Sequence, residues 1–428
     1  MITQRDVHHV TYTRFRRRIR RRGSSQGPAA STPLSTWGQC ETGFEFDTVC
    51  QRLDLDSPSK RQETILRPSQ EKIQGHILKH EHRIHNSYSS TKDNSNDREP
   101  FAVLNKSSSS QHGRSVMKLA APALLNDYYA NLLDCSCNGM IALALGSSVY
   151  LWSSETHTLA GQIYPHLSKT QLGRPYPHSQ TISSLCWCRD GTALCIGTRQ
   201  GEIQLWDVEH KRNMRCLPSH MSVVRVLSWK QQLLSSGSIL GRIHHHDPRA
   251  PAHLVGTAVQ QGALCSLQWS PGDDQLASGS TDGVLYIWDS DITGLSRSRQ
   301  PLTTMEQPSA VKAIGWCPWQ TKMIATGGGW RDGQLRIWDT ESGTCVASVN
   351  TNSQICSLKW AESKRCLVTG HGLPHHYVSC WVVQTDGSLS LNYQLSGHLN
   401  RVLHVDLNPG CTQIFSAGAD QSLHIWDM

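Results

Sequence analysis

The feature that most constrains this chain is a motif in which a short apolar run ends in tryptophan and aspartate. Four strong copies recur along the sequence: Gln204–Asp207, Tyr286–Asp289, Arg336–Asp339 and His424–Asp427. Weaker copies end at Trp152 and Trp381, and one copy carries His246 in place of tryptophan. The seven positions are 40 to 54 residues apart, which is the period of four-stranded propeller blades. The sequence therefore predicts an all-β, seven-bladed propeller.

The fourth unit shows the internal order of one blade most clearly. Three strand-like segments, Leu264–Ser270, Gln275–Ser280 and Val284–Trp288, are separated by turn signals. In the last unit a histidine, a turn aspartate and the final tryptophan recur at spacings that suit a buried hydrogen-bond network. We expect structural and not catalytic roles for five residues of this kind: Asp282, Asp332, His398, Asp420 and Trp426.

The repeats begin near residue 116. Residues 116–428 are expected to form the seven-bladed WD40 β-propeller, and residues 1–115, which are rich in polar residues, a largely disordered basic and polar tail. The sequence stops at Met428, directly after the third strand of the last unit, which would leave a sheet edge open. We expect the segment Ser115–Leu119 to supply the missing outer strand and to close the ring.

The net charge of +7 is concentrated at one end of the chain. Residues 1–22 hold eight arginines against the single acid Asp6, and the rest of the chain is neutral overall. This distribution excludes a broadly basic domain that coats nucleic acid. The arginine run has three interpretations: a nuclear import signal, an RNA-binding arm or a solvated charge block. Import is favoured over RNA binding, because few aromatic residues interleave the run, and we expect the protein in nucleus and cytoplasm. The candidate import residues are Arg16, Arg17, Arg18, Arg20, Arg21 and Arg22.

Neither catalysis nor metal binding is predicted from the sequence. Three adjacent histidines, His244, His245 and His246, cannot converge on one ion from a strand, because alternate residues face opposite sides. The fifteen cysteines lack zinc-ribbon spacing, and their odd number fits reduced thiols. No phosphate-binding, nucleophile-elbow or zinc-protease motif occurs, and no apolar run is long enough to cross a membrane. We expect an interaction platform with no enzymatic activity, no cofactor and no metal.

Several stretches of the repeat region carry a resemblance beyond the repeat itself. Asn126–Asp134, Trp316–Gln320 and the histidine triplet resemble the Fizzy family, the substrate-recruiting co-activators of the anaphase-promoting complex, or cyclosome. The resemblance covers residues 116–428, and Asn350–Leu358 looks most like the divergent B-type homologue of cell division cycle protein 20. It implies a propeller that binds degrons, the short recognition peptides of substrate proteins, and presents these substrates to the ubiquitin ligase.

The resemblance also implies degron-binding residues. Asp127 matches the acidic residue that pairs with the arginine of a destruction box. Gln354 and Arg401 match two of the three residues that hold a Lys-Glu-Asn degron, and an exposed Arg401 would suit ion-pair recognition. Thr281 stands where the family has asparagine, and its hydroxyl lacks the paired donor and acceptor of an amide.

The family's ligase-docking motifs are not recognisable in this sequence. The pair Asp97-Arg98 is not followed by the aromatic–Ile–Pro order of the family's tail motif, and the sequence ends in Asp427-Met428 without the family's terminal Ile-Arg. Two functions remain. The first is a degron-binding adaptor that recruits substrates to the anaphase-promoting complex and activates its ubiquitin transfer in cell-cycle proteolysis. The second is a non-activating scaffold that keeps the propeller.

Overall fold

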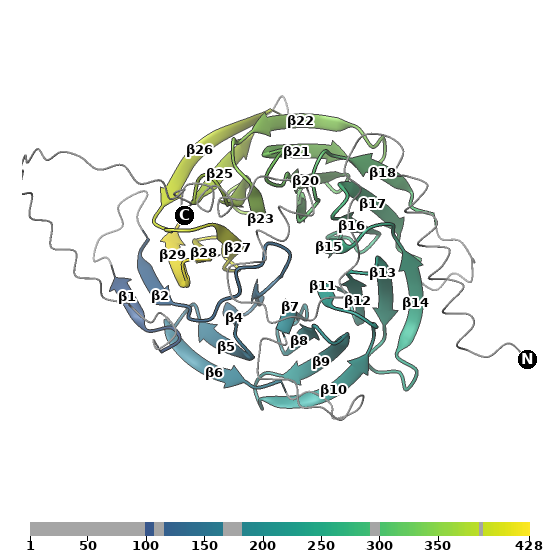
Figure 1. The fold of residues 1–428 in the computed structure, drawn as a ribbon, viewed down its shortest axis with the longest axis horizontal. Helices are drawn as coiled ribbons and strands as arrows, with labels where there is room; N and C mark the ends of the chain where they lie inside the picture. The colour runs from purple at the N-terminus through teal and green to yellow at the C-terminus, as the bar shows by residue number, and fades with distance from the viewer. Residues whose placement is uncertain (1–98, 107–114, 166–181, 292–299, 385–387) are drawn as a thin grey trace, which may run out of the picture. The chain divides into compact units, whose positions relative to one another are not determined.

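The structure is a computed structural model, and it describes residues 99–106, 115–165, 182–291, 300–384 and 388–428. Within these ranges the strands form seven antiparallel sheets, which are arranged as blades around a central axis (Figure 1). The predicted seven-bladed propeller is therefore confirmed. The arginine run lies outside the described residues, and so does the Asp97-Arg98 pair. None of the described segments forms a helix with the length and apolar character that a membrane crossing requires.

Six blades are four-stranded sheets whose strands follow one another in sequence, from the innermost to the outermost. Blade one consists of β3 (Leu133–Cys135), β4 (Met140–Leu145), β5 (Ser148–Ser153) and β6 (Thr158–Ile163). Blade two consists of β7 (Ile182–Trp187), β8 (Ala193–Thr198), β9 (Glu202–Asp207) and β10 (Arg212–Pro218). Blade three consists of β11 (Val224–Lys230), β12 (Leu233–Ser238), β13 (Arg242–His246) and β14 (Leu254–Val259). Blade four consists of β15 (Leu264–Trp269), β16 (Gln275–Ser280), β17 (Val284–Asp289) and β18 (Thr303–Glu306). Blade five consists of β19 (Ala313–Trp316), β20 (Met323–Gly327), β21 (Gln334–Asp339) and β22 (Cys345–Asn350). Blade six consists of β23 (Ile355–Ala361), β24 (Cys366–His371), β25 (Tyr377–Val383) and β26 (Leu389–Ser396).

The seventh blade joins the two ends of the repeat region. Its strands lie in the order β1 (Val103–Lys106), β2 (Met117–Ala120), β29 (Ser422–Asp427), β28 (Gln413–Gly418) and β27 (Val402–Leu407). The strand β2 pairs antiparallel with β29, and Leu119 lies opposite Leu423. This is the position at which the sequence analysis places the closing strand.

Described structure begins earlier than residue 116. The strand β1 pairs with β2, and Phe101 is buried, with its ring stacked on Trp152 at 6.4 Å between centroids. Only four residues, Phe101–Leu104, are consecutively apolar here, which is too short a run to show a strand period. The contact that anchors this segment therefore comes from a residue 51 positions away in the sequence and has no local signal.

The outermost strand of a blade is less buried than the strands nearer the axis. The inner strand β8 is buried along its whole length, whereas the outer strand β22 is half-buried or exposed throughout. Inner strands pack between neighbouring blades on both faces, which explains their near-continuous apolar sequences. Trp152 and Trp426 are among the largest fully buried side chains.

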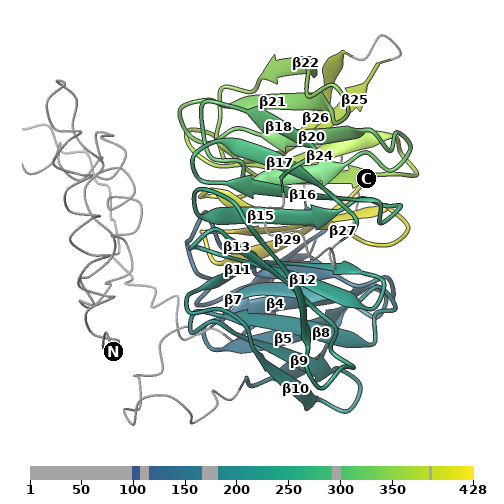
Figure 2. The same cartoon turned by 90° about the vertical axis from the view of Figure 1, so that its right-hand side faces the viewer.

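The innermost strands define two ends of the propeller, which Figure 2 shows from the side. β23 and β27 begin directly after Gln354 and Arg401. We call the end at which the innermost strands begin the entry end, and the end at which they finish the exit end. Because antiparallel neighbours reverse direction, the turn that follows β16 and carries Thr281 also lies at the entry end.

Candidate functional site

A segment between β2 and β3 lies across the entry end of the propeller, and we call residues 124–132 the crossing segment. Tyr128 is buried and donates its hydroxyl hydrogen to the carbonyl of Ile355 in blade six (3.2 Å). Arg401 of blade seven donates from Nε to Asn126 Oδ1 (2.6 Å) and from Nη2 to the Asn126 carbonyl (3.0 Å). The segment is thus held by blades far from its own position in the chain.

The same segment is also bonded to blades three and five. Asn131 donates from Nδ2 to the carbonyl of Arg225 in blade three (2.9 Å), and it accepts from Lys312 Nζ of blade five (2.6 Å). The guanidinium of Arg225 lies 4.8 Å from the ring centre of Tyr129. Burial lowers the pKa of Lys312 to about 8. These contacts pre-organise the entry end, so that a bound peptide would meet a fixed surface.

Asp127 lies in the crossing segment and keeps part of its side chain exposed. The backbone N–H of Tyr129 donates to Oδ1 (2.8 Å), while Oδ2 lies 3.8 Å from an Nη atom of Arg199. The side chain of Asp127 is 16% exposed. A pair at 3.8 Å is longer than a charge-assisted hydrogen bond, so an incoming guanidinium can form a shorter, bidentate pair with this carboxylate.

The expected exposure of Arg401 is wrong. Arg401 is only 5% exposed, because its guanidinium holds both the side chain and the backbone of Asn126. The sequence contains no local signal for this pairing, since the two residues are 275 positions apart.

The two remaining candidates also lie at the entry end, in different blades. Gln354 directly precedes β23 and is 5% exposed; its backbone N–H donates to Leu373 O (3.0 Å). Thr281 follows β16 and is half-buried, and its backbone N–H donates to Ala263 O (2.9 Å). Of the four candidates, Asp127 is the one that is charged, partly exposed and paired only at a long distance, 3.8 Å from Arg199.

The repeat residues of the last blade form a continuous network. Trp426 Nε1 donates to Ser416 Oγ (2.8 Å), Ser416 Oγ lies 2.8 Å from His398 Nε2, and His398 Nδ1 lies 3.1 Å from Asp420. Burial alone would raise the pKa of Asp420, but hydrogen bonds from His398, Leu399 N and Ser422 outweigh burial and lower it. His398, Asp420 and Trp426 thus occupy structural positions, joined by a serine that the sequence analysis did not single out.

Other blades keep the network with different residues. In blade four Gln260 takes the place of histidine: Ser278 Oγ donates to Gln260 Oε1 (2.5 Å), and Trp288 Nε1 donates to Ser278 (2.7 Å). Asp282 is exposed and accepts from Ser280. Gln260 precedes Asp282 by the same spacing that separates His398 from Asp420, and this spacing is the signal that could have identified it.

Blade five binds its turn aspartate to an arginine. The two terminal nitrogens of the Arg336 guanidinium donate to Asp332, at 2.6 and 2.7 Å, and the Asp332 side chain is 4% exposed. In blade three the Trp position holds His246, which is fully buried and lies within 3.1 Å of the hydroxyls of Ser219 and Ser236. These residues stabilise their own blades internally and are not exposed reactive groups.

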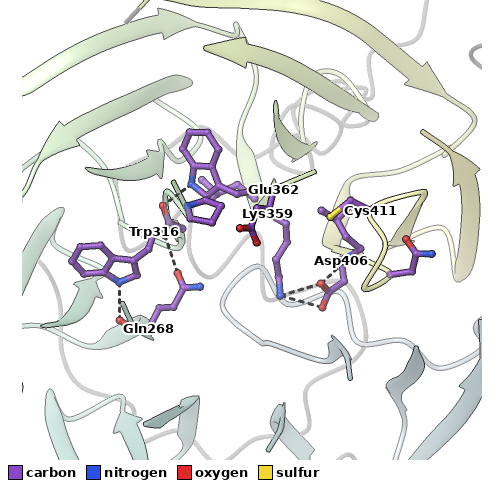
Figure 3. A pocket seen from close by; sticks show the side chains of 12 residues that line it. Gln268, Trp316, Lys359, Glu362, Asp406 and Cys411 are labelled. Atoms are coloured by element: carbon purple, nitrogen blue, oxygen red, sulfur yellow. Dashed lines mark hydrogen bonds and ion pairs between the residues drawn. The ribbon is translucent and has the colours of Figure 1, made fainter. Parts of the chain in front are cut away.

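A pocket of about 260 Å³ opens at the exit end (Figure 3). Lys359 and Asp406 lie on its wall, and Lys359 Nζ is 3.1 Å from Asp406 and 3.7 Å from Asp134. Asp406 also accepts from the backbone N–H of Cys135 (3.0 Å), and Asp134 from that of Trp187 (2.7 Å). Burial raises the pKa of Asp134, although the Lys359 charge acts in the opposite direction. The three charged side chains join blades one, six and seven.

We expect Lys359→Met to lower the free energy of unfolding by about 2 kcal/mol. The Asp406 side chain is 7% exposed and would lose its cation. The cost exceeds the roughly 1 kcal/mol of a surface pair, but it stays below the roughly 3–5 kcal/mol of a fully buried pair, because the Lys359 side chain is 38% exposed. Urea denaturation at neutral pH measures the change. Lys322→Met is the matched control, since Lys322 pairs with Glu341 at 2.6 Å with both side chains largely exposed; equal losses in both variants would contradict the prediction.

Comparisons with known proteins identify relatives over the same region. The family model described as the CDC20/Fizzy WD40 domain matches residues 119–426. A Dictyostelium discoideum protein named anaphase-promoting complex subunit cdc20 is 38% identical over 310 residues, which is 72% of this chain and 59% of that protein. An Arabidopsis thaliana protein named cell division cycle 20.5, cofactor of APC complex, is 36% identical over 315 residues, 72% of this chain and 67% of that protein. The match to the first relative thus spans less than two thirds of its length.

A solved structure and a further relative agree with this assignment. One chain in a crystal structure of the mitotic checkpoint complex superposes with a TM-score of 0.67 at 32% sequence identity, covering 77% of this chain and 99% of that one. The B-type cell cycle switch protein ccs52B of Medicago truncatula is 34% identical over 72% of this chain and 60% of its own length. The family model covers nearly the whole propeller, and the relatives exceed 30% identity over the same blades. The chain therefore belongs to the CDC20/Fizzy family of WD40 proteins.

Proposed function

We propose that this protein is a degron-binding adaptor that recruits substrate proteins to the anaphase-promoting complex and activates its ubiquitin transfer. The proposed mechanism is proximity: a bound substrate gains a high effective concentration near the ligase. The names of its relatives as cofactors or subunits of this complex support the proposal. Within the family we propose the B-type homologue of cell division cycle protein 20 as the subtype, on the residues Asn350–Leu358. The adaptor role requires no catalytic residue, and we propose nucleus and cytoplasm as its location.

The observation that carries the proposal is the state of Asp127. Its carboxylate lies at the entry end on a segment anchored by several blades, is partly exposed, and has a cation only at 3.8 Å. A rigidly held acid with spare acceptor capacity is what a peptide arginine needs for a bidentate pair. Because the crossing segment is already ordered, binding would not have to offset the entropy of ordering it.

We expect Asp127→Ala to weaken the binding of an arginine-bearing destruction-box peptide by roughly 10- to 100-fold. A hydrogen bond to a charged group contributes about 1.5–3 kcal/mol, and 1.4 kcal/mol is tenfold in affinity. Fluorescence anisotropy with a labelled peptide measures the change. Glu155→Ala removes an exposed carboxylate from the exit end of blade one and should leave the affinity unchanged. If Asp127→Ala binds as tightly as the unmutated chain, Asp127 is not the arginine site.

The second function, a non-activating scaffold, is favoured by a different observation. Gln354 and Arg401 are each 5% exposed, and Arg401 holds Asn126 in place. Thr281 also replaces the family's asparagine. Co-precipitation with the anaphase-promoting complex, followed by a ubiquitination assay with a destruction-box substrate, separates the two functions. Association with increased ubiquitination supports the adaptor; degron binding without ubiquitination leaves the scaffold.

A further inference from the structure

The last blade holds a group of side chains that could bind a ligand, in addition to the hydrogen bonds of the repeat network. His398, Asp420 and His424 each offer one ligand atom, and these atoms all lie within 4.8 Å of one another. In the part of the chain that the structure describes, no other group of three or more His, Cys, Asp or Glu side chains meets this spacing.

His424 has no structural explanation in the repeat network. It is 2% exposed, and neither ring nitrogen has a hydrogen-bond partner among the described residues. Its ring lies 4.1 Å from that of His398 and 5.1 Å from that of Trp426, between centroids. Phenylalanine would fill the same space, whereas a neutral imidazole leaves one donor and one acceptor unmet, at about 1–3 kcal/mol each. The nitrogens therefore point to a ligand.

We propose that His398, Asp420 and His424 bind a divalent transition-metal ion of the zinc class. Two imidazoles and a carboxylate are ligands that zinc takes in proteins, and a fourth position is left open. His398 Nδ1 lies 3.1 and 3.2 Å from the two Asp420 oxygens. This is close to the roughly 3.3 Å that separates tetrahedral ligand atoms at zinc distances of about 2.0–2.1 Å.

Most of the repeat network remains when the ion is bound, and the ion takes the place of the hydrogen bond between His398 Nδ1 and Asp420. His398 then carries its proton on Nε2, 2.8 Å from Ser416 Oγ, and donates to that hydroxyl while Nδ1 faces the ion. Trp426 still donates to Ser416 (2.8 Å). A metal-binding histidine usually donates its other ring N–H to a polar neighbour in this way.

Two neighbouring side chains, a histidine and a lysine, lie around the proposed site. His376, half-buried in the loop between β24 and β25, has a buried Nδ1 without a hydrogen-bond partner among the described residues. Its ring does not meet the spacing of the three proposed ligands, so the fourth position stays open. Lys118, opposite His424 in the β2–β29 pairing, opposes a cation. The carboxylate of Asp420 compensates for that charge.

The test is zinc and cobalt binding by the full chain without an affinity tag. The unmutated chain should retain one zinc per molecule after dialysis, measured by mass spectrometry. His424→Phe, which keeps the ring and removes both nitrogens, should lower the affinity by at least about 100-fold, more than the loss of an outer partner does. His404→Phe, which removes another buried histidine of the same blade, should retain the ion.

The spectrum of bound cobalt gives a second, independent readout. The described residues include thirteen free cysteines, which could bind zinc elsewhere. Ligation by His and Asp predicts cobalt d–d bands without strong thiolate charge-transfer bands. The proposal is overturned if the unmutated chain retains no ion, if His424→Phe and His404→Phe retain it equally, or if thiolate bands dominate. The result does not depend on whether the protein binds degrons or the ligase.

Discussion

A chain that starts at residue 121 will not unfold cooperatively, whereas a chain that starts at residue 99 will unfold as the full chain does. The difference between the two is the segment that contains β1 and β2. Of these two strands, β2 is the one that pairs with β29 and completes the seventh blade. We therefore expect loss of the ring, and not a small decrease in stability, when β2 is removed.

The physical reason is the combined loss of core side chains and of an edge partner. Met117, Leu119 and Ala120 are at most 3% exposed, and burial of a large aliphatic side chain contributes about 1.5–3 kcal/mol. Removal of β2 would also leave unpaired the backbone groups on the outer edge of β29. A domain of ordinary stability, with about 5–15 kcal/mol in total, cannot sustain both losses.

Calorimetry and tryptophan fluorescence on the two chains test this prediction. A third chain that starts at residue 115 keeps β2 and lacks β1, so it separates the contribution of the closing strand from that of β1 and Phe101. We expect it to unfold cooperatively at a lower temperature than the chain from residue 99. A cooperative transition at an unchanged temperature in the chain from residue 121 would show that β2 does not close the ring.

The seven blades could be predicted because each carries its own signal. A Trp-Asp ending or its variant occurs once in each unit, and the turn residues around it follow local rules, as in Thr281–Gly283. The open edge after the final strand likewise follows from the sequence order and from the pairing needs of a sheet. Local patterns therefore specify the blade count and the chain order of the strands.

The entry end could not be predicted in the same way, because its contacts join distant segments. Arg401 is buried by Asn126, which is 275 residues away, and Lys312 bonds with Asn131 across 181 residues. The family resemblance identified Asp127 as a candidate but contains no information on its neighbour Arg199. The triad of Asp134, Lys359 and Asp406 exists only when the ring closes. Such contacts depend on the angle between blades and leave no period in the sequence.

The second large effect is expected in acid. The propeller should lose stability as the pH falls from 7 to roughly 5, because it buries several histidines in their neutral form. Burial lowers the pKa of His371 and His404 to about 3, with added contributions from His375 and Lys312 respectively. Burial and neighbouring histidines likewise lower the pKa of His246 to about 3. For His424 burial, together with the charges of His398 and Lys118, lowers the pKa to about 2.

The direction follows from the protons that each state binds. Below about pH 6.5 the unfolded chain protonates these four side chains, while the folded chain does not until its own lower pKa values are reached. Unfolding therefore takes up protons, and the free energy of unfolding falls by about 1.4 kcal/mol per pH unit for each histidine. Asp134 has the opposite effect, because its pKa is raised in the folded state. It adds stability as the pH falls, and this gain offsets the loss from about one of the four histidines.

Urea denaturation between pH 7 and 5.5, with a chelator present to remove bound metal, measures this slope. Burial also lowers the pKa of His220 to about 3. We therefore expect a net uptake of at least about three protons on unfolding and a loss of at least roughly 4 kcal/mol over the interval. His404→Phe should reduce the uptake by one proton, because its ring is 4% exposed. A free energy of unfolding that stays constant over this interval would mean that the buried histidines are not held neutral by the fold.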